Sequence, residues 1–340
     1  MRREIAEQPA TVAATLAALH PLTDEIGLLA RGRGHVLLYG RGTSGHAAMY
    51  GRYLIEKTSG RVAALGAPSL ATLYGARPDL SDALVVVCSQ SGATTEMIDV
   101  AGWARERGAR TIGITNASVS PLGERVDLAL VTQCGLERAV PATKTYTGAL
   151  VAVAVLADAL CPRRQAWATG LDHLADDVRL ALNCDLEPAA KTLAGIGSLI
   201  AIGRGLTLGA AQEVALKIAE TTGITCVGLS SSDLQHGPTA MFNPRVGVVV
   251  MAAANGPTRS GLDTMTRVAS DRGCPTVVVG DLDGSDRGGA RVRLCRSTVE
   301  ELVPIVLAIP GQQLAAAMAE RLGLSPDHPS GLSKITQTVQ

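Results

Sequence analysis

Short apolar runs alternate along this chain with longer stretches in which apolar residues recur every three or four positions. Such runs are typical of strands buried on both faces, and the longer stretches are typical of helices that cover a sheet. In the first half we predict strands at residues 35–39, 62–65, 84–88, 111–115 and 128–131. In the same half we predict helices at about residues 11–30, 47–56, 97–107 and 145–160.

The alternation breaks at Cys161-Pro-Arg-Arg and then repeats. A polar helical segment, residues 171–182, leads into the second half. Strands are predicted there at residues 199–202, 226–229, 246–251, 276–279 and 292–295, and helices at 210–220, 264–270 and 300–322. Both opening strands end in a similar sequence, Gly40-Arg-Gly-Thr-Ser-Gly and Gly203-Arg-Gly-Leu-Thr-Leu-Gly. This echo indicates a duplicated domain.

Apolar strands that alternate with helices predict an α/β fold. Each half should form a doubly wound parallel sheet flanked by helices, a flavodoxin-like three-layer sandwich. A chain of 340 residues exceeds the ~250 residues at which single cores stop growing. We therefore predict two domains, residues 1–163 and 164–340.

The amino-acid composition limits the classes of function that this protein can have. Hydrophobic residues make up 46% of the chain and charged residues 18%, so a large core can form. The net charge is zero and only 2% of residues are aromatic, which argues against nucleic-acid binding. No run approaches the ~20 apolar residues of a membrane span, and no signal peptide is recognisable, so we expect a cytoplasmic protein. The seven cysteines form no C-x-x-C pair, which predicts reduced core residues without a disulfide framework or zinc site.

One turn concentrates hydrogen-bond donors between a predicted strand and a predicted helix. Ser89, Gln90 and Ser91 end the strand at residues 84–88, and Thr94 precedes the helix. Hydroxyl groups, backbone N–H groups and the positive end of the helix dipole converge there, so an oxyanion, most plausibly a phosphate, would fit. A serine-rich N-cap without a ligand is the alternative.

The first glycine-rich loop matches the G-x-G-x-x-G pattern of dinucleotide-binding folds. That fingerprint also requires an acidic residue at the end of the next strand, and Val62-Ala-Ala-Leu-Gly-Ala offers none. Gly42, Thr43 and Ser44 fit equally well in a loop whose backbone approaches a sugar or a phosphate.

These motifs resemble those of the SIS (sugar isomerase) family. The resemblance continues through Glu137-Arg-Ala-Val-Pro-Ala-Thr-Lys144, Glu213-Val-Ala-Leu-Lys-Ile-Ala-Glu220, Asp233-Leu-Gln-His-Gly-Pro238 and Leu332-Ser-Lys334. In this order they are similar to the isomerase part of glucosamine-6-phosphate synthase, across almost the whole chain. The resemblance implies two tandem SIS domains, phosphosugar binding and no cofactor or metal.

Three residues depart from the family pattern: Asp233 stands where glutamate is common, Gln235 where lysine is, and Ala93 where glutamate is. They could alter the substrate. The synthase also begins with a glutaminase domain whose nucleophile is a cysteine directly after the initiator methionine, whereas Arg2 and Arg3 follow Met1 here. We therefore expect no glutamine hydrolysis.

The resemblance implies an isomerase or deaminase that interconverts an amino-sugar phosphate, such as glucosamine 6-phosphate, with a ketose phosphate plus ammonia. Two alternatives stay open. One is an isomerising aminotransferase subunit that receives ammonia from a separate glutaminase. The other is a non-catalytic sugar-phosphate sensor.

The chemistry requires a base that moves a proton between C1 and C2 of the sugar. Glu220 is the candidate, because apolar neighbours on its helix suggest partial burial, which raises the pKa of a carboxylate. Lys217 lies one turn earlier on the same face and, with Lys334, is a catalytic candidate to engage the sugar carbonyl. The alternative is a solvated ladder of Glu213, Lys217 and Glu220.

In similar enzymes the residue that matches His236 opens the sugar ring from the neighbouring subunit, which implies a homodimer. The lysine that matches Lys334 contacts the open-chain sugar from a closing tail. An isolated structural histidine and a frayed terminus with a solvated lysine are the alternatives.

The remaining candidates bind substrate. The predicted set is Gly42, Thr43, Ser44, Ser89, Gln90, Ser91, Thr94, Val140 and Ser333. Glu137 and Thr143-Lys144 should order the sugar-binding loop. Alternatively, Thr143 is a plain N-cap and Lys144 is exposed.

Overall fold

The computed structural model of the protein describes all residues except 164, 281, 283–288, 295–297 and 335–340. Contacts divide the described chain into two compact units. The amino-terminal unit comprises residues 10–137 and 144–172, and the carboxy-terminal unit comprises residues 1–9, 138–143 and 173–334. The predicted domain boundary after residue 163 stays a prediction, since a unit defined by contacts need not follow a single cut of the chain.

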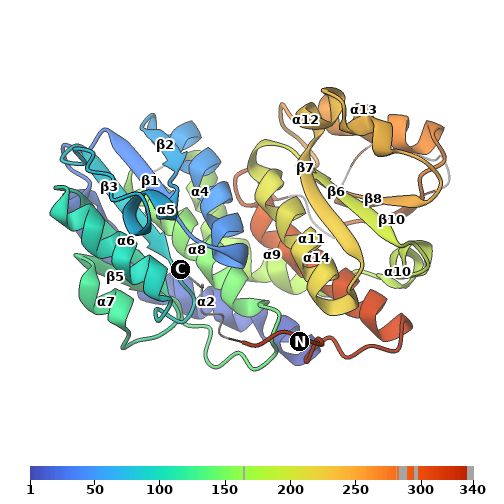
Figure 1. The fold of residues 1–340 in the computed structure, drawn as a ribbon, viewed down its shortest axis with the longest axis horizontal. Coiled ribbons are helices and arrows are strands. Elements are labelled where there is room, and N and C mark those ends of the chain that lie inside the picture. The colour runs from blue at the N-terminus through green and yellow to red at the C-terminus, as the bar shows by residue number, and fades with distance from the viewer. Residues whose placement is uncertain (164, 281, 283–288, 295–297, 335–340) are drawn as a thin grey trace. The chain divides into compact units, whose positions relative to one another are not determined.

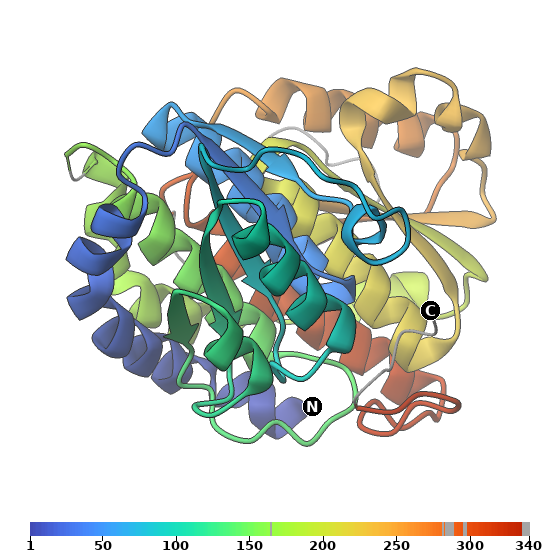
Figure 2. The same ribbon diagram turned by 60° about the vertical axis from the view of Figure 1, so that its left-hand side comes forward.

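The amino-terminal unit is built on a parallel sheet with the strand order β2-β1-β3-β4-β5 (Figure 1). The strands are β1 (His35–Tyr39), β2 (Val62–Leu65), β3 (Ala83–Cys88), β4 (Arg110–Thr115) and β5 (Leu128–Val131). The helices are α3 (Thr23–Leu29), α4 (Gly42–Ser59), α5 (Pro68–Thr72), α6 (Thr95–Glu106), α7 (Pro121–Arg125) and α8 (Lys144–Ala159), and α2 (Gln8–Leu19) begins in the other unit. Helix α6 packs with α5 and α7, and α4 packs with α8, so helices cover both faces of the sheet (Figure 2). All six residues of β3 are buried as a result.

The carboxy-terminal unit has a second parallel sheet, with the strand order β10-β9-β8-β6-β7. Its strands are β6 (Ser198–Gly203), β7 (Thr225–Ser230), β8 (Val246–Ala252), β9 (Thr276–Gly280) and β10 (Ala290–Val292). Its helices are α1 (Arg2–Ala6), α9 (Leu174–Ala181), α10 (Glu187–Leu193), α11 (Leu208–Thr222), α12 (Ser231–Gln235), α13 (Arg259–Asp271) and α14 (Val303–Arg321). Helices α11 and α14 lie side by side in Figure 1.

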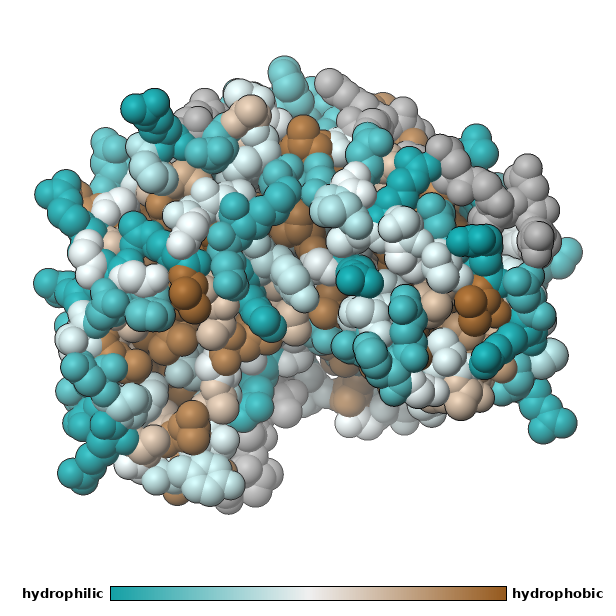
Figure 3. All heavy atoms as spheres, turned by 90° about the horizontal axis from the view of Figure 1, so that it is seen from above, coloured by the Kyte–Doolittle hydropathy of each residue, from teal (hydrophilic) through white to brown (hydrophobic). Residues whose placement is uncertain are grey.

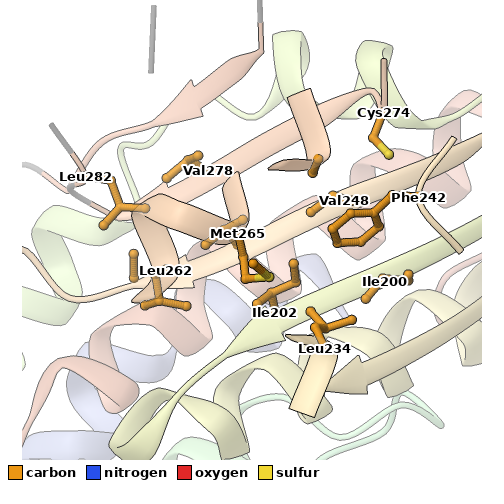
Figure 4. Close-up of a cluster of buried hydrophobic side chains, with 13 residues drawn as sticks. Ile200, Ile202, Leu234, Phe242, Val248, Leu262, Met265, Cys274, Val278 and Leu282 are labelled. Atoms are coloured by element: carbon orange, nitrogen blue, oxygen red, sulfur yellow. The ribbon is translucent and has the colours of Figure 1, made fainter. Parts of the chain in front are cut away.

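The core between this second sheet and α13 consists of apolar side chains. Leu262 and Met265 of α13 pack over Ile202 and Val248 of the sheet, and Phe242 closes one end (Figure 4). The four apolar side chains of α13 and the sheet are at most 3% exposed. Burial of a large apolar side chain contributes roughly 1.5–3 kcal/mol, so this cluster fixes α13 on the sheet.

The repeated sequence Gly-Arg-Gly marks a repeated structure. Numbered from its opening strand, each sheet has the order 2-1-3-4-5. A Cβ atom on Gly40 would lie 2.6 Å from the Ser44 carbonyl oxygen, and one on Gly203 would lie 2.5 Å from that of Thr207. Only glycine allows the chain to turn so tightly from the strand into the next helix.

Several predicted elements need correction. The single helix predicted at about residues 11–30 is two helices, α2 and α3, separated by a 3₁₀ turn at His20–Leu22 that contains Pro21. The strand predicted at residues 292–295 is found at Ala290–Val292, and Cys295 lies outside the described residues. Helices α5, α7, α10 and α12 were not predicted, since five to seven residues are too few to show a periodic pattern.

Within the described chain, α14 is long and apolar enough to cross a membrane by length and composition alone, contrary to our expectation that no segment comes close. However, 89% of its apolar window is buried inside the structure, where it packs against α11. On the face shown in Figure 3, hydrophilic residues predominate, and the largest group of hydrophobic residues lies among them on the left. Helix α14 is therefore explained as a core helix.

Candidate functional site

The amino-terminal sheet has its topological switch point between β1 and β3. These strands are neighbours, with Tyr39 beside Val87, and the helices that follow them, α4 and α6, cover opposite faces. Ligands of such folds bind in the crevice outside the carboxyl ends of the strands at this point. The loops at residues 40–44 and 89–94, both predicted to bind substrate, lie here together.

Hydrogen bonds hold the turn at residues 89–94 in its conformation. The Ser89 hydroxyl donates to the Thr94 hydroxyl at 3.2 Å, and the Ser91 hydroxyl accepts from the Ala93 backbone N–H at 3.2 Å. The Gln90 carbonyl accepts from the Asn116 N–H at 2.9 Å. Thr94 occupies the N-cap position of α6, but its side chain makes no capping bond. Side-chain capping by Thr94 therefore does not explain this hydroxyl-rich turn.

An ion pair that we did not predict joins the two loops. The Arg41 guanidinium donates to both carboxylate oxygens of Glu96, in the first turn of α6, at 2.8 and 2.7 Å. Glu96 is only 5% exposed, whereas Arg41 reaches solvent. The hydroxyl-bearing residues Thr43 and Ser44 follow Arg41 and are half-buried. The arginine in both Gly-Arg-Gly motifs was the available signal for this pair.

In the carboxy-terminal unit, Lys217 lies between two carboxylates of α11. Its ammonium donates to Glu220 and lies 3.5 Å from Glu213. The side chains of Lys217 and Glu213 are 1% and 3% exposed, so the solvated ladder is ruled out. Glu220 keeps 23% of its side chain exposed, which agrees with the predicted partial burial. The arrangement presents one accessible carboxylate, held in place by a buried cation.

His236 follows α12, outside any helix, and is exposed. Helix α11 runs from the carboxyl end of β6 back to the start of β7, so Glu220 lies near the amino edge of the sheet. His236 comes after the carboxyl end of the six-residue β7. At ~3.3 Å per residue, the strand separates these edges by about 20 Å. One chain therefore does not bring Glu220 and His236 together.

The described part of the tail is docked on residues 138–140. The Lys334 ammonium donates to the Ala139 carbonyl at 2.7 Å, and the Val140 N–H donates to the Asp327 carbonyl at 3.0 Å. Lys334 and Val140 are half-buried, and Ser333 is exposed. A frayed terminus with a solvated lysine does not describe this tail.

A cavity of about 400 Å³ lies beside the same segment, and it contains none of the predicted site residues. It is lined by Met1, Arg2, Arg3, Glu4, Arg138, Ala139, Glu320, Ser325, Pro326 and Asp327.

Glu137 anchors the start of α8. Its carboxylate accepts from the Thr145 N–H at 3.2 Å and from the Thr145 hydroxyl at 2.6 Å. Lys144 is 4% exposed, so the alternative with an exposed lysine is wrong. In the part of the chain that the structure describes, no group of three or more His, Cys, Asp or Glu residues could hold a metal ion.

Comparisons with known proteins define the class. The SIS domain profile matches residues 28–159, which carry the loops at 40–44 and 89–94. The second sheet repeats the strand order of the first. Residues 28–159 thus form a SIS domain, and the predicted fold of two tandem SIS domains is confirmed.

More particularly, the chain is 33% identical to the isomerizing glutamine–fructose-6-phosphate aminotransferase of Symbiobacterium thermophilum, over 98% of this chain and 58% of that protein. It thus spans somewhat more than half of this relative. The C-terminal domain of glucosamine-fructose-6-phosphate aminotransferase from Francisella tularensis has the same fold, with a TM-score of 0.86 and 24% identity over 96% of this chain and 97% of that one. Glucosamine-6-phosphate deaminase from Thermotoga maritima shares it too, with a TM-score of 0.77 and 22% identity over 99% of both chains.

Proposed function

We propose that this protein is a phosphosugar isomerase that acts as an amino-sugar-phosphate deaminase, converting a substrate such as glucosamine 6-phosphate and water into fructose 6-phosphate and ammonia. The observation that carries the proposal is the Glu220 carboxylate, which is open to solvent and held by the buried ammonium of Lys217. A carboxylate fixed in this way is suited to carry a proton between two adjacent carbons. The names of the relatives and the SIS fold support sugar phosphates as substrates.

In the proposed mechanism, Gly42, Thr43, Ser44, Gln90, Ser91 and Thr94 hold the phosphate and sugar hydroxyls, on a turn shaped by Ser89. His236 of a neighbouring subunit opens the ring. Glu220 then takes the proton from C2 and returns it to C1, and water hydrolyses the resulting C2 imine to the ketose and ammonia. Lys334 and Ser333 of the docked tail, with Val140 of the segment on which the tail docks, engage the open-chain sugar.

Lys217 is better placed to position Glu220 than to reach the sugar carbonyl, because two carboxylates already surround its ammonium. The proposal also includes a homodimer, which supplies the second subunit, and a cytoplasmic location, where phosphosugars occur.

The direct test incubates the purified protein with glucosamine 6-phosphate and measures ammonia and fructose 6-phosphate. Glu220→Gln should lower kcat about 100-fold or more, the usual size of a lost acid–base group. Ser89→Ala should mainly raise KM. Glu56→Gln, an exposed carboxylate on α4, is the matched control and should leave both constants unchanged. Lack of turnover with glucosamine, galactosamine, fructosamine and N-acetylated phosphates would retire the enzyme proposal.

A second candidate, an isomerising aminotransferase, is favoured by the name of the relative from Symbiobacterium thermophilum. Formation of glucosamine 6-phosphate from fructose 6-phosphate only after a glutaminase and glutamine are added would select it. Sugar-phosphate binding without turnover under either condition would select the sensor instead.

A further inference from the structure

The carboxyl edge of the second sheet repeats the switch point of the first. Strands β6 and β8 are neighbours, as β1 and β3 are. Arg204 follows β6 as Arg41 follows β1, and both arginines have extended backbones just before a glycine with positive φ. Helix α13 follows β8 as α6 follows β3. We propose that Arg204, Ser231 and the first turn of α13 form a second phosphate-binding site.

The two edges differ in how the arginine charge is balanced. In the amino-terminal unit, Glu96 in the first turn of α6 neutralises Arg41. The first turn of α13 has no acidic residue. Gly261 faces Arg204 instead, because a Cβ atom on Gly261 would lie 3.2 Å from an Arg204 guanidinium nitrogen. Arg204 forms no ion pair with any residue that the structure describes.

An unpaired guanidinium at the amino-terminal end of a helix is electrostatically unfavourable, because that end carries partial positive charge. A bound anion removes the conflict and gains from both charges. Arg259, also in this turn, points elsewhere: its guanidinium donates to the Ala254 carbonyl and lies 3.9 Å from Asp263. The acid nearest this turn on α13 is thus already beside another arginine.

A buried hydroxyl points to a ligand independently of the charges. Ser231 is 0% exposed, and its Oγ has no hydrogen-bond partner within the described chain. That oxygen would lie 3.4 Å from the same Cβ position on Gly261, beside Arg204. Buried hydroxyl groups are normally paired, and one left alone next to a free cation fits an oxyanion.

The geometry suits the tetrahedral oxygens of a phosphate group. Thr258, the N-cap residue of the 13-residue α13, makes no side-chain capping bond, so backbone N–H groups of the first turn remain available to an anion. Arg204 is half-buried and reaches the surface, which gives a ligand access. Free phosphate and the phosphate of a sugar phosphate share this chemistry.

The test counts bound phosphate per chain by equilibrium dialysis at pH 7.5, with inorganic phosphate and with fructose 6-phosphate in separate arms. We expect two sites per wild-type chain for at least one of these probes. Arg204→Gln should remove one site or weaken it at least tenfold. Gly261→Glu should do the same, because the new carboxylate would pair with Arg204 as Glu96 pairs with Arg41. Ser89→Ala should weaken the other site only.

Asn183→Glu is the control for Gly261→Glu, since it adds the same charge to the same unit at an exposed position outside the proposed site. It should retain phosphate binding within about threefold, and thermal melting should show that each variant is folded. The proposal is overturned if folded Arg204→Gln and Gly261→Glu proteins bind both probes as the wild type does. Because the experiment measures binding, it tests the second phosphate-binding site separately from the proposed enzymatic activity.

Discussion

At the scale of single residues, the turn at residues 89–94, a proposed substrate loop, depends on a glycine. Gly92 has a φ of 62°, and a Cβ atom on it would lie 2.4 Å from the Ser120 hydroxyl oxygen. Gly75 has a similar φ of 57°, but a Cβ atom there would meet nothing within 4 Å. Alanine substitutions at the two positions therefore separate two losses in the free energy of unfolding. One comes from the positive φ, and the other comes from the clash of the added methyl group.

We therefore expect Gly75→Ala to cost about 1–2 kcal/mol, the penalty for a left-handed backbone. Gly92→Ala should cost about 1–3 kcal/mol more, because the methyl group must displace Ser120. Urea unfolding of both variants measures the difference. Equal losses would show that the turn at residues 89–94 tolerates the displacement.

Lys217 contributes to stability in a different way, because its charge is buried between two carboxylates. Replacement by methionine leaves Glu213 and Glu220 together without their cation, and removal of one partner from a buried ion pair costs about 3–5 kcal/mol. Lys191→Met, at an exposed position of α10, should change stability by no more than about 0.5 kcal/mol. Similar unfolding midpoints for the two variants would contradict the proposed role of Lys217.

At the scale of elements, β3 is buried from end to end, and burial in the same unit accounts for two of the cysteines, Cys88 and Cys134. Burial raises the pKa of the Cys88 thiol, at the end of β3, to about 12, and that of Cys134 to about 11. Both thiols are thus neutral near physiological pH and shielded from reagents. They serve as packing residues, as the sequence predicts.

Iodoacetamide at pH 8 should consequently leave Cys88 and Cys134 unmodified in the native protein. A raised pKa leaves little thiolate at this pH, and only the thiolate reacts. In urea both should be alkylated, because the unfolded chain restores the ordinary pKa. Peptide mass spectrometry reads out each site, and rapid native labelling of Cys88 would contradict the buried strand.

At the scale of the whole molecule, the separation of Glu220 from His236 by the length of β7 has a consequence for assembly. If both residues act on one sugar, they must come from different chains. The implied homodimer then has two sites, each with Glu220 from one subunit and His236 from the other.

Mixing two inactive variants tests this arrangement. Glu220→Gln and His236→Asn proteins, unfolded together and refolded, form mixed dimers in which one of the two sites is intact. Random pairing should restore about one quarter of wild-type activity. Glu220→Gln refolded with itself is the control and should stay inactive. Absence of recovery in a confirmed mixed dimer would place both residues in the same subunit.

The strands, most helices and the repeated Gly-Arg-Gly turns were predictable because local patterns encode them. A buried parallel strand reads as a continuous apolar run, and a tight strand-to-helix turn requires glycine wherever it occurs. The loops at residues 40–44 and 89–94 could be proposed as substrate loops for the same reason, since hydroxyl-rich turns are contiguous in the chain. Helices such as α12 were not predicted, because they are too short to show the hydrophobic periodicity of a helix.

The remaining features were decided by contacts between residues far apart in the chain. Spacing put Glu213, Lys217 and Glu220 on one face of a helix, but only the tertiary structure decided that Lys217 and Glu213 are buried. Arg41 and Arg204 occupy matching places in the sequence, yet among the residues that the structure describes only Arg41 meets a carboxylate. The charge environment of each depends on which residue the distant helix presents, Glu96 or Gly261, and no local pattern contains that information.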